Sequence, residues 1–154
     1  MTGPQQELLA EPPPAVLAVL DDLRGFTQLV ERVGGADRIG TRKPTDVRGL
    51  FVWVRSAGGF PLNAARGAWS RTVQIEVGAA APVAQELPEL AVERVAGLIA
   101  VHFASKRRAQ VFQGASWRAR PLDGPFDMTD TSRGADAPVF KQGVRLDVRM
   151  HAPV

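Results

Sequence analysis

The sequence predicts an α+β domain, in which a mainly antiparallel sheet of about four to five strands carries two main helices on one face. Residues 72–77, TVQIEV, alternate strictly between polar and apolar side chains, as in a strand with one buried face. An apolar-faced helical segment ending at Phe103 follows directly, and residues 143–150 repeat the alternation. Because a strand with one apolar face needs a covering layer, we expect the helix to lie across the sheet.

The length and composition are those of one globular domain. Hydrophobic residues make up 45% of the 154 residues and charged residues 23%, which excludes wholesale disorder. We expect the polar, proline-rich residues 1–13 to lack fixed structure and residues 14–154 to form the domain. No segment has the pattern of a signal peptide or the length of an apolar membrane span, so we expect a soluble protein without membrane contact. The absence of cysteine excludes disulfides and thiolate metal sites.

The basic residues are mostly arginine. The formal net charge is +3, and only three of the 19 basic residues are lysines, at positions 43, 106 and 141. Arginine suits bidentate pairing at interfaces, although a GC-rich genome would give the same bias without any function. The charge alone therefore favours no particular partner.

Residues 14–33 predict the first helix. Pro14 suits a first helical position, the apolar side chains that follow have helical spacing up to Val30, and Gly34-Gly35 is a stop signal. Residues 34–49 then predict a loop that carries several basic side chains.

The next segments predict two strands and irregular chain between them. Residues 50–55 form an apolar β run, and Gly58-Gly59 is a turn signal. Residues 61–71 are loop-like and carry arginines, after which residues 72–78 form the one-sided strand.

The second helix has one apolar and one acidic face. The apolar positions are Leu87, Ala91, Val95, Leu98 and His102, and the acidic positions are Glu86, Glu89 and Glu93. Pro88 either kinks a helix that starts near Pro82 or is the first residue of the helix, and the second alternative is favoured. We expect His102 to be a buried core histidine and Val95, Leu98 and Ile99 to be buried.

Two later segments predict strands that share a basic face. Residues 115–120 and 143–150 alternate, with Trp117 on the apolar side of the first. If these strands are neighbours, four arginines form one exposed row with Asp147 among them to pair internally. The four are Arg118, Arg120, Arg145 and Arg149. Residues 121–138, rich in aspartate, glycine and proline, predict a long loop between the strands.

No motif of an enzyme, a cofactor site or a metal site is present. The sequence has no Walker loop, dinucleotide fingerprint, GxSxG or HExxH pattern. Four aspartates share residues 121–138, but their spacing matches no EF-hand, so we expect solvated loop charges. We therefore predict no catalytic, cofactor-binding or metal-binding residues. The basic sheet face leaves nucleic-acid binding as an alternative, which is disfavoured because aromatic side chains for base stacking are missing from it.

Four stretches of the sequence, together with the order of the expected helices, loops and strands, carry a family resemblance. They are DRIGTRKP before the first strand, LFVWVRSAGG, TVQIEVGA with its helix, and the closing VRLDVRM. Over about residues 14–152 the chain resembles the tail terminator proteins of long, non-contractile-tailed bacteriophages. Residues 1–13 are not part of the match.

The resemblance implies a structural virion protein instead of an enzyme. Such a protein forms a homohexameric ring that caps the tail tube, stops tube polymerisation and joins the tail to the head-tail connector. Its partners are further copies of itself, the tail tube protein and the connector or stopper protein, and genomic DNA only passes through the ring. It locates to the tail or neck of the virion, and to the host cytoplasm during assembly.

Charged side chains of loops and strand faces are the candidate interface residues, since a ring needs heterologous contacts between different patches. They are Arg38, Arg42, Lys43, Arg66, Arg71, Arg118, Arg120, Asp127, Arg145 and Arg149. The alternatives are a small nucleic-acid-binding domain that uses the basic sheet face, or another head-tail connector component.

Overall fold

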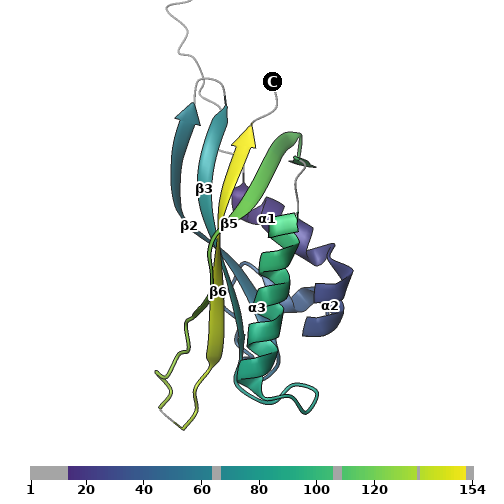
Figure 1. Cartoon of the computed structure of the whole chain (residues 1–154), viewed down its shortest axis with the longest axis vertical. Helices are drawn as coiled ribbons and strands as arrows, with labels where there is room; N and C mark the ends of the chain where they lie inside the picture. Colours follow the sequence, from purple (N-terminus) through teal and green to yellow (C-terminus); the bar gives the residue numbers. More distant parts are fainter. Residues whose placement is uncertain (1–13, 64–66, 106–108, 135, 152–154) are drawn as a thin grey trace, which may run out of the picture.

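The computed structural model describes residues 14–63, 67–105, 109–134 and 136–151. Figure 1 shows a long, curled sheet with all its helices on one side. The elements are α1 (Ala15–Arg24), α2 (Thr27–Val33), η1 (Ala36–Arg38), β1 (Ile39–Gly40), β2 (Phe51–Asn63), β3 (Ala68–Ala79), α3 (Pro88–Ser105), β4 (Gln110–Phe112), β5 (Ala115–Asp127) and β6 (Phe140–His151). The predicted stretch 1–13 lies outside the described residues.

The sheet has six strands in the order β1-β2-β3-β6-β5-β4. The pair β1–β2 is parallel and the other four pairs are antiparallel. The predicted α+β architecture with a helix-covered sheet is confirmed, but the described chain has six strands instead of four or five, and α1, α2 and α3 instead of two helices. The last strand lies at the centre because Val144, Leu146 and Val148 supply a continuous apolar row for the helices to cover.

The predicted first helix is two helices. Gly25 and Phe26 separate them, and Phe26 takes an extended conformation with φ −86° and ψ 92°. Its ring stacks on His102 of α3 with centroids 4.1 Å apart, so the break turns an aromatic side chain onto the neighbouring helix. Gly34 ends the second helix in the left-handed conformation, with φ +89°, which confirms the predicted stop.

The segment around Gly58-Gly59 is not a turn, and the predicted loop 61–71 is strand at residues 61–63 and 68–71, with residues 64–66 outside the described part. These strand residues belong to the long antiparallel pair of β2 and β3, whose register shifts between Ser56 and Gly59. Such a shift is a β-bulge, and it needs glycine here: Gly59 has φ +145°, and a Cβ on it would lie 2.5 Å from the carbonyl oxygen of Ser70. The two glycines therefore lie within a strand that continues to Asn63, beyond the predicted end at residue 55.

Helix α3 begins at Pro88, as favoured, and covers the sheet with Val95, Ile99 and Phe103. Leu98 is only half-buried at the margin of the core, so its predicted full burial is wrong. Leu87 is 55% exposed, because it precedes the helix and does not follow helical spacing.

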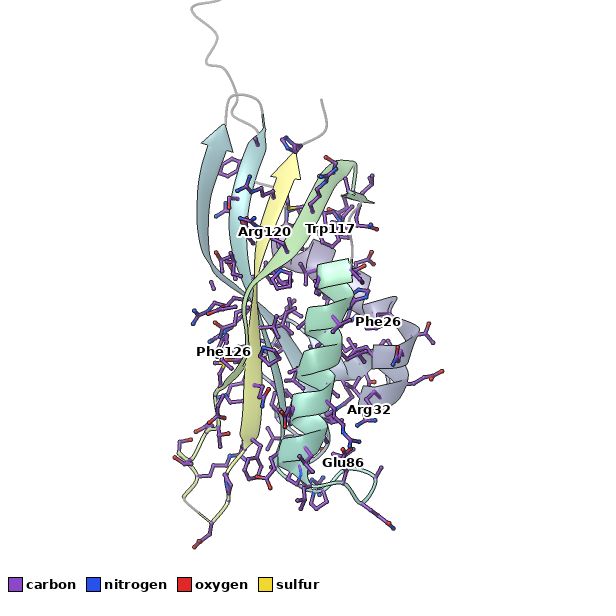
Figure 2. The ribbon with its side chains drawn as sticks, viewed as in Figure 1. Phe26, Arg32, Glu86, Trp117, Arg120 and Phe126 are labelled. Atoms are coloured by element: carbon purple, nitrogen blue, oxygen red, sulfur yellow. The ribbon has the colours of Figure 1, made fainter. Side chains whose placement is uncertain are left out.

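Glu86 also differs from the prediction of an exposed side chain. Its carboxylate lies 2.9 Å from Nη2 of Arg32 and 2.8 Å from Nη1 of Arg94. Figure 2 shows Glu86 and Arg32 close together where α2 meets the start of α3. The predicted exposure of Glu89 and Glu93 is confirmed.

The first part of the predicted loop 121–138 belongs to a strand. β5 continues to Asp127, which pairs with Gln142, and only residues 128–139 connect β5 to β6. Pro121 and Pro125 are compatible with this strand because β4 covers β5 only from Ala115 to Trp117, so the rest of β5 is a sheet edge.

Candidate functional site

The sheet face away from the helices carries a row-by-row array of polar side chains, here called the open face. Residues opposite one another on neighbouring strands share a face, so the strand register fixes its rows. From β3 through β6 to β5 the rows read Gln74–Arg145–Asp123, Thr72–Asp147–Arg120 and Ser70–Arg149–Arg118. The four predicted arginines therefore lie together on one face, as the alternation predicts, and Trp117 is buried on the helix side.

Asp147 is at the centre of the two rows that begin with Thr72 and Ser70. Its Oδ1 accepts a hydrogen bond of 2.9 Å from Oγ of Ser70, and its Oδ2 lies 3.2 Å from Nε of Arg149 and 3.4 Å from Nε of Arg120. The residue is only 8% exposed, whereas both arginine side chains are more than half exposed. One buried carboxylate thus orients two guanidinium groups, and with Arg118 alongside, this end of the face keeps a surplus of positive charge.

The row Gln74–Arg145–Asp123 has a net charge closer to zero. Arg145 donates to Oε1 of Gln74 at 3.2 Å and to Oδ2 of Asp123 at 3.3 Å, and its guanidinium lies 4.9 Å from the centroid of the Phe126 ring. Figure 2 shows Phe126 on this side of the sheet. Asp123, predicted as a solvated loop charge, is therefore a strand residue with an ion-pair partner.

Glu76 is buried on the open face, at 1% exposure. Its Oε1 accepts from Nε2 of Gln74 at 3.3 Å and lies 3.2 Å from Nη2 of Arg55, whereas Oε2 has no hydrogen-bond partner in the described part of the chain. Arg55 and Glu76 were not among the predicted interface residues. The alternation of TVQIEV places Glu76 on the same face as Gln74, which was the available signal.

The other candidate interface residues lie elsewhere. Arg71 faces the helix side of the sheet with its guanidinium 5.2 Å from the Trp69 ring centroid, and Arg66 is outside the described residues. Asp127 ends β5 and accepts hydrogen bonds from Oγ1 and the backbone N–H of Thr129, which hold the pKa of its carboxyl below the usual range. Neither Arg71 nor Asp127 belongs to the open-face rows.

The three basic candidates before β2 share a cavity of about 430 Å³. Arg38, Arg42 and Lys43 line it together with Arg24, which the sequence analysis did not single out. Arg24 follows the apolar part of α1 and becomes part of this site only through the fold.

His102 belongs to α3, and its mostly buried side chain contacts α1. Its Nε2 is 2.8 Å from Oδ2 of Asp22, and its ring stacks on Phe26, so its environment is that of a packed interhelical contact, close to the predicted core position. Within the described ranges, no cluster of three histidine, aspartate or glutamate residues is arranged to hold a metal ion. None of the helices in this part of the chain is long and apolar enough to span a membrane.

No family model, no curated protein and no solved structure matches this chain.

Proposed function

We propose that this protein is a structural virion protein that forms a ring at the end of a phage tail tube, stops tube polymerisation and joins the tail to the head-tail connector. The observation that carries the proposal is the open face. Asp147 orients Arg120 and Arg149, Arg118 lies beside them, and all three arginine side chains are exposed.

Such a face suits a protein partner. Arg120 and Arg149 are oriented by the buried Asp147, which reduces the entropy lost when a partner orders them, and arginine is enriched in the cores of interfaces. A ring requires heterologous contacts, in which one patch of a copy meets a different patch of the next. The helix side has a different chemistry, with exposed Asp21, Glu31, Glu89 and Glu93. One protomer therefore offers both a basic and an acidic surface.

A second candidate function is nucleic-acid binding by the same basic face. Base stacking requires aromatic rings that are free to receive a base. On the open face, Phe126 lies under Arg145, and the ring of Trp53 is covered by Arg55 at 4.7 Å. Trp117 is buried on the opposite side. These contacts favour the ring over sequence-tolerant binding of single strands.

The proposed ring has protein partners on both of its sides. The ring is homo-oligomeric, with six copies as in the family that the sequence resembles. It contacts the tail tube protein on one side and the connector or stopper protein on the other, in the neck of the virion. Genomic DNA passes through the lumen without being the specific ligand.

Complementation of a phage that lacks its tail terminator tests this function. Tail lengths are measured by electron microscopy, with and without the protein. Overlong tube polymers that shorten when the protein is supplied support the proposal. Tails of normal length that join heads in its absence contradict it. Size-exclusion chromatography with light scattering distinguishes the second candidate, for which a monomer that responds to DNA is expected.

A further inference from the structure

The cavity beside β1 concentrates positive charge. Four cationic side chains line it, from the end of α1, from η1 and from the residues that follow β1: Arg24, Arg38, Arg42 and Lys43. Two carboxylates, of Asp37 and Asp46, also line it. In the described part of the chain, none of the four cations forms an ion pair, so the lining carries a positive surplus that no carboxylate contacts.

Arg24 and Arg38 are oriented by hydrogen bonds to backbone carbonyls. Nε of Arg24 donates to the carbonyl oxygen of Ile39 at 2.9 Å. Arg38 donates from Nε to Leu50 at 2.9 Å and from Nη2 to the carbonyl oxygens of Asp46 and Gly49 at 3.0 and 3.1 Å. A guanidinium has five N–H donors, so both groups keep donors for a further acceptor. These hydrogen bonds orient both groups before any ligand arrives.

The two carboxylates of the lining have other contacts. Oδ1 of Asp46 accepts from the backbone N–H and Nε of Arg48, at 3.1 and 3.2 Å. Oδ1 of Asp37 lies against Gly35, since a Cβ built on that glycine would be 2.6 Å from it. The lining thus holds four cations and two carboxylates, and neither of these carboxylates forms an ion pair with the four cations in the described part of the chain.

We propose that this cavity binds a phosphate group. Guanidinium groups match phosphate oxygens with paired, charge-assisted hydrogen bonds, and a lysine adds a compact charge. A singly charged carboxylate can be satisfied by one guanidinium, whereas several convergent cations suit the two charges of a phosphate. Thr41 and Thr45 also line the cavity and bring neutral hydroxyl donors. The ligand is either a free phosphate or pyrophosphate, or a phosphate of the DNA backbone.

This inference does not depend on the proposed ring. The cavity is built from α1, η1 and the residues around β1, and it contains none of the open-face arginines. Loss of phosphate binding and loss of assembly are therefore separate outcomes.

The test compares two double variants that remove the same charge. Arg42→Ser with Lys43→Ser alters exposed side chains of the cavity, and Arg118→Ser with Arg120→Ser alters exposed side chains of the open face. Inorganic phosphate and pyrophosphate are titrated into each protein by calorimetry, and a short DNA duplex is titrated by fluorescence anisotropy. We expect the cavity variant alone to lose about tenfold or more in affinity, since it lacks two charged donors.

The results identify the source of the phosphate. Binding of the free anions that the cavity variant loses indicates a small ligand, and binding of the duplex alone, with a salt slope reduced by about one to two in the cavity variant, indicates the DNA backbone. The inference is overturned if neither probe binds the wild-type protein, or if the open-face variant loses as much affinity as the cavity variant. Thermal melting verifies that both variants fold, and the single variant Arg42→Gln repeats the test with a smaller change.

Discussion

Oγ of Ser70 lies 2.9 Å from Oδ1 of Asp147, and this hydrogen bond joins β3 to β6 beneath the arginines of the open face. The same carboxylate faces Arg120 and Arg149 through its other oxygen. A buried carboxylate between two strands thus links the stability of the sheet centre to the geometry of the basic surface.

Replacement of Asp147 by asparagine should destabilise the fold. Asparagine keeps the shape of the side chain but removes the charge that faces two guanidinium groups, and hydrogen bonds to charged groups are worth about 1.5–3 kcal/mol. We expect the free energy of unfolding to fall by about 1–3 kcal/mol, measured by urea denaturation followed by circular dichroism. Arg118→Ala, on the same face without an ion pair among the described residues, is the control and should change stability by at most about 0.5 kcal/mol. An unchanged midpoint for Asp147→Asn would show that Asp147 is not a structural centre.

Two neighbouring residues of α3 should differ in their contribution to the core. Ile99 is fully buried, and Ile99→Ala should cost about 2–5 kcal/mol, as other core truncations do. Leu98 lies half-buried at the core margin, so Leu98→Ala should cost clearly less. Thermal or urea unfolding of both variants measures the difference. Equal losses, or a larger loss for Leu98→Ala, would contradict the placement of α3 on the sheet.

The alternation of polar and apolar side chains was sufficient to predict the strands with one buried face. Side-chain periodicity predicts the strands around residues 72–78 and 143–150, and the preference of proline for the first helical position predicts the start of α3 at Pro88. The structure confirms all three. The glycines and prolines of β2 and β5 misled the prediction, because these residues are usual in turns but also occur in bulges and sheet edges. Only the pairing partner distinguishes the two cases, and the partner strand is distant in sequence.

The candidate site was predictable to a similar extent. The shared face of Arg118 and Arg149 follows from alternation in two strands, once those strands are neighbours. The burial of Glu76 and the position of Arg24 were not predictable, because both depend on contacts between distant segments. The proposed ring stays a prediction.

The bulge in β2 should depend on one of its two glycines more than on the other. Gly58 and Gly59 both have positive φ, of +103° and +145°, so alanine is strained at either position. A Cβ at position 59 would also meet the carbonyl oxygen of Ser70 at 2.5 Å, whereas nothing lies within 4 Å of one at position 58. We expect Gly59→Ala to lower the melting temperature more than Gly58→Ala. Equal effects would mean that strain alone, without the close strand contact, sets the cost.

Charge reversal on the open face should weaken assembly more than folding. Arg118 and Arg120 are exposed strand residues, so Arg118→Glu with Arg120→Glu leaves the core intact, although the pair of Arg120 with Asp147 is lost. We expect this variant to keep most of its unfolding free energy but to fail to form the oligomer seen for the wild-type protein by size-exclusion chromatography with light scattering.

The control adds two negative charges on the helix side, with Thr27→Glu and Gln28→Glu at exposed positions of α2, which keeps the acidic character of that side. Like charges in place of the arginines would repel an acidic partner surface, and this effect is local to the open face. The prediction fails if the open-face variant assembles like the wild-type protein, or if the control variant loses assembly to the same extent. In the complementation assay, the same open-face variant should leave tails overlong, which connects the arginine rows to tail termination.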